Sequence, residues 1–166
     1  MAQALLYLLI GFIVFEFILT RLLDYLNLKT WRRTLPPELK PFYNEEKYHR
    51  AQQYEKAGKS LSLVSGSLSF VIIIALLCFG GFGRLDEFVR QFTGHPVLMA
   101  LHFFGIIFIV SEIIGLPFSL YSTFVIEEKF GFNRTTPKTF LLDKIKGYAL
   151  TIILGGGLLS LLIFFY

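Results

Sequence analysis

The stretch Ser119–Gly147 reads SLYSTFVIEEKFGFNRTTPKTFLLDKIKG and separates two long apolar runs, at about 97–120 and 148–166. Each run has the roughly 20 residues that a helix needs to cross the hydrocarbon core of a bilayer. Backbone groups within lipid must bond to one another, so runs of this length predict helices and not isolated strands. The stretch itself is polar, and it predicts a connection outside the hydrocarbon region.

Two further apolar runs lie before this region, at about 4–23 and 61–82. The chain has 54% hydrophobic and only 17% charged residues, against about 45–50% and 25% in soluble domains. No basic residue precedes Arg21, so we expect the first run to be a retained helix and not a cleaved signal peptide. The predicted fold class is all-α: an integral membrane domain over residues 1–166, with four transmembrane helices.

The 16 basic residues all lie outside the apolar cores and are distributed unevenly among the connections. Nine lie at or after the end of the first run, two lie between the second and third runs, and five lie between the third and fourth. Because basic connections stay in the cytoplasm, the first and third connections are predicted to be cytoplasmic and the N-terminus outside. This topology explains the net charge of +4 without a nucleic-acid partner.

The cytoplasmic connections carry helix signals of their own. Asn44 is a suitable N-cap for a helix over 45–57 that Gly58 would end. Thr136 and Pro137 predict the start of a second helix that reaches Gly147. We therefore expect two short cytoplasmic helices at the membrane interface. The prolines at 36, 37 and 41 predict an extended entry to the first connection.

Two strings in these connections are long and unusual. The first is the LYSTFVIEEKFGFN segment that begins at Leu120, followed by Thr135–Thr136 and Ile145–Lys146; the second combines Leu35–Leu39, Tyr43–Tyr48 and Gln53–Gly58. Together they resemble the N-terminal membrane region of the Ste24-type (M48) zinc metalloproteases, the CAAX prenyl protease family. The resemblance extends from about Thr34 to Gly147.

The catalytic signature of that family, His-Glu-x-x-His, does not occur in this sequence. Its three histidines, His49, His95 and His102, have no partner at that spacing. We therefore expect no catalytic residue, no metal ligand and no cofactor in this chain, with zinc belonging to the intact parent protein. The chain is interpreted as the membrane half of a protease without its catalytic zinc domain.

The resemblance implies a zinc endopeptidase that processes CAAX-type substrates or takes part in membrane-protein quality control. Its expected partners are the lipid bilayer, a C-terminal catalytic domain and a peptide or membrane-protein substrate. Its expected location is a bacterial inner or plasma membrane, or an ER-type membrane in a eukaryote. The alternative is a non-enzymatic four-helix scaffold or an ion- or proton-transport subunit, and a His-Glu-x-x-His motif beyond Tyr166 in the gene would decide against it.

Several polar residues lie within or near the apolar runs. An ionisable side chain inside a membrane helix is costly and is a functional-site hypothesis by default. Glu112 and Ser119 are seven residues apart and share a helical face, as do Glu16, Thr20 and Asp24 at intervals of four. We expect Glu112, Ser119, Glu16 and Thr20 to line a polar chamber, with helix packing and ordinary helix-end polarity as the open alternatives.

A second group lies in the polar stretch Ser119–Gly147. We expect Glu127, Glu128, Asn133 and Arg134 to form a loop that contacts the catalytic domain, and a solvated connection is the alternative. The small residues Ser62, Gly66 and Ser69 predict close helix packing. His102 is expected to be a buried, hydrogen-bonded histidine and not a metal ligand.

Overall fold

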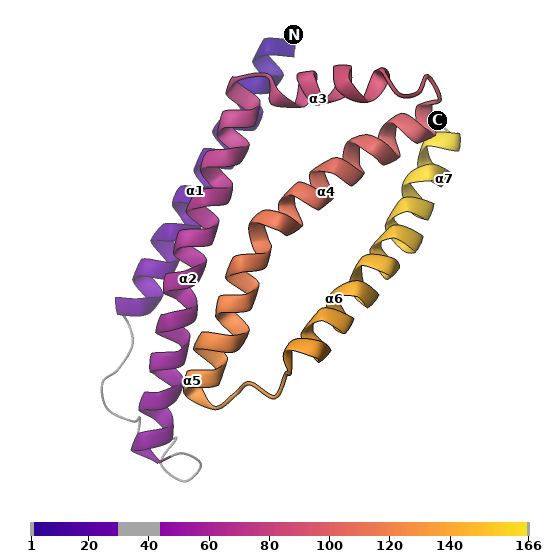
Figure 1. Ribbon diagram of the computed structural model, residues 1–166. Helices are drawn as coiled ribbons and strands as arrows, with labels where there is room; N and C mark the ends of the chain where they lie inside the picture. The colour runs from indigo at the N-terminus through magenta and orange to yellow at the C-terminus, as the bar shows by residue number, and fades with distance from the viewer. Residues whose placement is uncertain (1, 30–43, 166) are drawn as a thin grey trace. The chain divides into compact units, whose positions relative to one another are not determined.

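The computed structural model describes residues 2–29 and 44–165, and their regular structure is entirely helical (Figure 1). The prolines at 36, 37 and 41, with their predicted extended entry, lie outside the described residues. The elements in chain order are α1 (Ala2–Lys29), α2 (Glu45–Cys78), α3 (Gly81–Arg90), α4 (Pro96–Tyr121), the π-helix η2 (Ser122–Glu127), α5 (Glu128–Phe130), α6 (Pro137–Leu150), the π-helix η3 (Thr151–Gly156) and α7 (Gly157–Phe165).

Four helical segments are long and apolar enough to cross a membrane, which confirms the predicted number. They cover Gln3–Lys29, Glu45–Cys78, Pro96–Phe130 and Pro137–Phe165. The shortest has 27 residues, or about 40 Å at 1.5 Å per residue, which exceeds the roughly 30 Å hydrocarbon core. Large apolar side chains are exposed along all four, as expected for helices that contact lipid.

The second segment corrects the predicted division into an interfacial helix and a span. Asn44 is the N-cap, as expected, and its Oδ1 accepts from the backbone N–H of Lys47 at 2.8 Å. Gly58 does not end the helix, because an interior glycine costs only about 1 kcal/mol while the residues on both sides continue the helix. The helix ends at Cys78 and not at Phe82, the predicted end of the span. Gly80 has a left-handed φ of 66°, which interrupts the helix before α3 begins.

The third and fourth segments are also longer than predicted. Helical structure continues past Leu120 through η2 and α5, and ends at Gly131, whose φ is 71°. The fourth segment runs without a break from Pro137 through Gly147, so the expected separate interfacial helix is wrong there too. Thr136 caps it as predicted, with Oγ1 accepting from the N–H of Thr139 at 3.2 Å.

The described chain forms two compact units, the first made of residues up to 79 together with 118–133. In this unit α1 and α2 run antiparallel, since Phe17 stacks on Phe70 with ring centroids 4.1 Å apart, while Asp24 lies near Lys59. α2 also packs against the η2–α5 end, where Tyr54 contacts the Phe130 ring edge-on at 5.8 Å.

The second unit comprises residues 80–117 and 134–166. Here α4 and α6–α7 run antiparallel, because Phe108 contacts Tyr148 and Leu101 lies 3.7 Å from the position of a Cβ built on Gly156. α3 was not predicted, and its Val89 is 1% exposed. The helix α4 continues through Pro117, the last residue of the first segment of this unit.

Candidate functional site: polar clusters between the membrane helices

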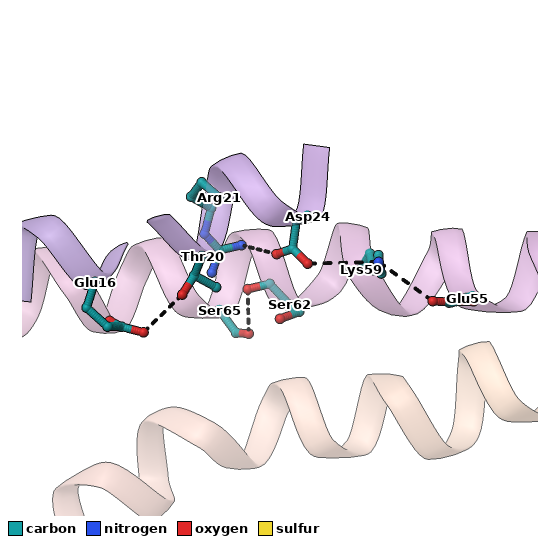
Figure 2. Close-up of polar contacts among 8 residues, drawn as sticks. All are labelled: Glu16, Thr20, Arg21, Asp24, Glu55, Lys59, Ser62 and Ser65. Carbon is teal, nitrogen blue, oxygen red and sulfur yellow. Dashed lines mark hydrogen bonds and ion pairs between the residues drawn. The ribbon is translucent and has the colours of Figure 1, made fainter. Parts of the chain in front are cut away.

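A ladder of alternating charges lies along the contact between α1 and α2 (Figure 2). Its carboxylates come from both helices, and two basic side chains lie between them. The members are Glu55, Lys59, Asp24, Arg21, Thr20 and Glu16.

Lys59 and Asp24 join the two helices at the centre of the ladder. Lys59 Nζ lies 3.9 Å from Asp24 Oδ1 and 3.6 Å from Glu55 Oε1. Asp24 Oδ2 in turn lies 3.6 Å from Nη1 of Arg21. Each of these four charged side chains has an oppositely charged neighbour. The pairing lowers the free-energy cost of placing a charge on an otherwise apolar helix.

Further along α1, Thr20 and Glu16 bond to each other. Thr20 Oγ1 donates to Glu16 Oε1 at 3.0 Å. These two predicted chamber residues are therefore adjacent, and Glu16 remains exposed in the isolated chain while Thr20 is half-buried. The bond between them is compatible with either a polar cavity wall or local helix polarity.

Arg21 enters the α1–α2 contact at a glycine. A Cβ built on Gly66 would lie 2.6 Å from Nη2 of Arg21, so this position accommodates the guanidinium only because it has no side chain. The guanidinium also lies over the Phe17 ring at 5.2 Å. Its Nε and Nη1 have no hydrogen-bond partner within the described residues. The space that Gly66 leaves is therefore filled by a charged side chain, and the close helix packing expected from Ser62, Gly66 and Ser69 stays a prediction.

The same contact contains a hollow of about 280 Å³. Acidic, basic and hydroxyl groups reach it from α1, and small and aromatic residues reach it from α2. Its lining is Ile13, Glu16, Phe17, Thr20, Arg21, Gly66, Ser69, Phe70 and Ile73. The lining is mostly apolar, with hydrogen-bonding groups on Glu16, Thr20, Arg21 and Ser69. Such a hollow is able to hold water that bonds to these groups.

A second cluster surrounds Glu112 in the other unit. Its Oε2 accepts from Lys144 Nζ at 2.9 Å and from Tyr148 Oη at 2.8 Å, both on α6. Phe108, one turn before Glu112, contacts the Tyr148 ring edge-on at 5.7 Å. The Glu112 and Lys144 side chains are 33% and 27% exposed. Glu112 is therefore half-buried and charge-paired, and its polar partners lie on another helix.

The sequence singled out Glu112 but not its partners. Lys144 and Tyr148 are four residues apart and share a helical face, as do Phe108 and Glu112. Each helix thus has one aromatic and one charged residue at i and i+4, and the two charges are opposite. That pattern is the signal from which contact between the two helices could have been predicted. Arg21 was missed in the same way, because it was counted only as a basic residue at a helix end.

The remaining predicted residues lie at the end of the third span. Ser119 is half-buried in the last turn of α4 and belongs to the first unit, so the face it was expected to share with Glu112 stays a prediction. Glu127 and Glu128 are helical, which corrects the expected loop. Asn133 Nδ2 donates to Glu128 Oε2 at 2.8 Å, and the exposed Arg134 follows it.

Backbone hydrogen bonds cap the C-terminal end of this helix. The carbonyl oxygen of Glu127 accepts from the N–H groups of Phe132 and Asn133 at 2.8 and 3.2 Å. The left-handed Gly131 makes that return possible. Glu127, Glu128 and Asn133 thus form one ordered turn, and whether the turn contacts another domain remains a prediction.

The described residues do not fit a zinc site. Within residues 2–29 and 44–165, no group of three or more His, Cys, Asp or Glu side chains is placed to hold a metal ion. His102 is exposed, contrary to the expectation that it is buried, although its Nδ1 donates to the carbonyl oxygen of Leu98 at 2.6 Å. No chemical step at a metal can therefore be assigned to these side chains.

Comparison with known proteins places the chain in a family. Residues 24–166 match the family described as CAAX prenyl protease N-terminal, with five membrane helices. The chain belongs to that family. The described part of the chain supplies four helices long enough to cross a membrane.

Individual relatives agree with this assignment. A CAAX prenyl protease 1 homolog of Arabidopsis thaliana is 32% identical over 93% of this chain and 38% of its own length. A human CAAX prenyl protease 1 homolog is 34% identical over 70% of this chain and 26% of its own length. The crystal structure of S. mikatae Ste24p matches with a TM-score of 0.78 and 28% identity, over 92% of this chain and 37% of that chain. The chain thus spans less than two fifths of each of these proteins.

Proposed function

We propose that this chain is the membrane-embedded N-terminal portion of a Ste24-like zinc metalloendopeptidase. The observation that carries the proposal is the family match over residues 24–166. The reaction class is CAAX-type processing or the cleavage of membrane proteins in quality control. The chain supplies walls and support, while zinc and the catalytic residues come from a domain outside it.

The chamber wall is assigned to Glu16, Thr20, Glu112 and Ser119. Charged side chains in membrane helices face a protein interior or a water-filled cavity, because a lipid-facing charge has no partner. The hollow beside Glu16 and Thr20 supports this role, as does the pairing of Glu112 with Lys144. The turn formed by Glu127, Glu128, Asn133 and Arg134 is proposed to contact the catalytic domain.

Thiol accessibility tests the chamber assignment in the protein made from the complete gene. In a Cys78→Ser background, cysteines replace Thr20 and, as a matched control on the same helix, the exposed Ile18. A membrane-impermeant, water-soluble thiol reagent should modify position 20 and spare position 18, provided that the chamber opens to water. Equal protection of both positions contradicts a water-filled chamber at this site.

The proposed orientation has the N-terminus outside, and the polar segments around Lys47 and Lys138 in the cytoplasm. The uneven distribution of basic residues supports it. In intact cells, an impermeant reagent should label Glu87→Cys on α3 and leave Lys47→Cys unlabelled. The reverse pattern overturns the orientation without affecting the family assignment.

A further inference from the structure

A second hollow lies in the first unit, between α2 and the η2–α5 end. Its volume is about 470 Å³, within the range of sites that bind small molecules. Most of its lining is apolar, and one cation lies at its rim. The lining residues are Ala57, Ser60, Leu61, Val64, Tyr121, Val125, Ile126, Lys129 and Phe130.

The hollow lies where α2 changes from polar to apolar. The residues of α2 before Ser60 include several charges, and those after it belong to the apolar run. A site at this level lies at the boundary between water and hydrocarbon. Tyr121 in the lining is typical of that boundary, because its ring is apolar and its hydroxyl group is polar.

One positive charge lies in the lining of the hollow and a second lies close to it. Lys129 lies in the lining. Arg50 lies on the same face of α2 as Tyr54, Ala57 and Leu61, by the i, i+4, i+7, i+11 spacing. The Nη2 atom of Arg50 lies 2.6 Å from the position of a Cβ built on Gly131. Gly131 directly follows Phe130, which lines the hollow. No carboxylate within the described residues forms an ion pair with either cation, and the nearby Glu128 bonds to Asn133.

From this arrangement we propose that the hollow binds an anionic phospholipid. The phosphate group contacts Lys129, with Arg50 adding to the attraction, and part of an acyl chain lies along Leu61, Val64 and Val125. Basic pockets between membrane helices recognise anionic lipid headgroups in this way. A neutral phospholipid would fill the apolar part equally well but would gain nothing from the two cations.

Spin-labelled lipids test the proposal on the protein made from the complete gene, purified and placed in bilayers. The ratio of the association constants of spin-labelled phosphatidylglycerol and phosphatidylcholine measures the preference for the anionic headgroup. We expect a clear preference in the unmodified chain at low salt. The Lys129→Gln substitution should lower this ratio about fivefold. That factor corresponds to the contribution of one basic residue to binding at an anionic surface.

Matched variants distinguish lipid binding at the hollow from attraction of anionic lipid to the basic surface as a whole. Lys138→Gln removes a charge of the same sign from the exposed first turn of α6 and should leave the preference nearly unchanged. Lys129→Arg should retain it. Ala57→Leu places bulk in the hollow without a charge change and should weaken retention of both lipids.

The unmodified chain alone is able to refute the proposal, so the test does not depend on how the variants fold. No preference for phosphatidylglycerol at low salt overturns it, as does a preference that survives 0.5 M NaCl undiminished, since salt screens exposed charges. An equal loss in Lys129→Gln and Lys138→Gln also overturns it, because it would mean attraction to the whole basic surface.

Discussion

The pairing of Glu112 with Lys144 predicts a measurable coupling between α4 and α6. Replacing Glu112 by Gln removes the negative charge but keeps the shape, and replacing Lys144 by Met removes the positive charge. Each single substitution leaves a half-buried polar group with less compensation than before. The double substitution removes both charges together, so its cost should be smaller than the sum of the two.

The size of the coupling follows from the burial of the pair. Exposed ion pairs contribute about 0.2–1 kcal/mol, and breaking a fully buried pair costs about 3–5 kcal/mol. Glu112 and Lys144 keep about a third of their side-chain exposure, at 33% and 27%, with a short 2.9 Å contact. We therefore expect each single substitution to cost about 2 kcal/mol, and a coupling energy of about 1–2 kcal/mol.

Reversible unfolding in mixed detergent micelles measures all four proteins of the cycle. The control cycle uses Asp143 and Lys146 on the same helix, which are 3.8 Å apart with side chains 64% and 76% exposed. That pair should show coupling within error of zero. Additivity of Glu112→Gln and Lys144→Met to within about 0.3 kcal/mol would refute the reasoning.

Four further predictions concern backbone positions and metal binding. Gly58→Ala should stabilise α2 by up to about 1 kcal/mol, whereas Gly66→Ala should gain less, because the new Cβ meets a guanidinium at 2.6 Å; equal gains in the same unfolding assay would contradict that packing. Gly80→Ala and Gly131→Ala should each destabilise by about 1–2 kcal/mol through their positive φ, and the guanidinium of the exposed Arg50 near Gly131 should add little because it is able to move aside; a neutral result at either glycine argues against the left-handed backbone there. Thr136→Ala should cost about 1 kcal/mol as a lost N-cap, and a neutral result would show that the cap bond does not persist in solution. The purified chain should bind no stoichiometric zinc by metal analysis, since its described residues offer no ligand set; one tightly bound zinc per chain would refute this.

Local signals in the sequence were sufficient for the helices that cross the membrane. Apolar length predicted their number, and the side chains of Asn44 and Thr136 predicted two helix starts correctly. The same local rules failed at Gly58 and Gly147, since a glycine ends a helix only when the residues after it leave the helical path. Here the following residues continue an apolar run, and the helix does too.

Contacts between helices were harder to predict. Glu112 and Lys144 are 32 residues apart in the sequence, so their pairing depends on which helices are neighbours and at what register. The intramembrane cost of a carboxylate identified Glu112 but carried no information about its partner. For Gly66, the small-residue pattern predicted close packing of helices and gave no sign that the Arg21 guanidinium would fill the space.

The central claim is that the chain is the membrane portion of a zinc endopeptidase, and peptide cleavage tests it most directly. The protein made from the complete gene is placed in liposomes with a prenylated CAAX peptide, the same peptide without the prenyl group and an unfolded membrane protein. The account predicts cleavage of at least one of these substrates, lost on zinc chelation and restored by added zinc. Failure to cleave any of them, by a folded and zinc-supplemented protein, would contradict it.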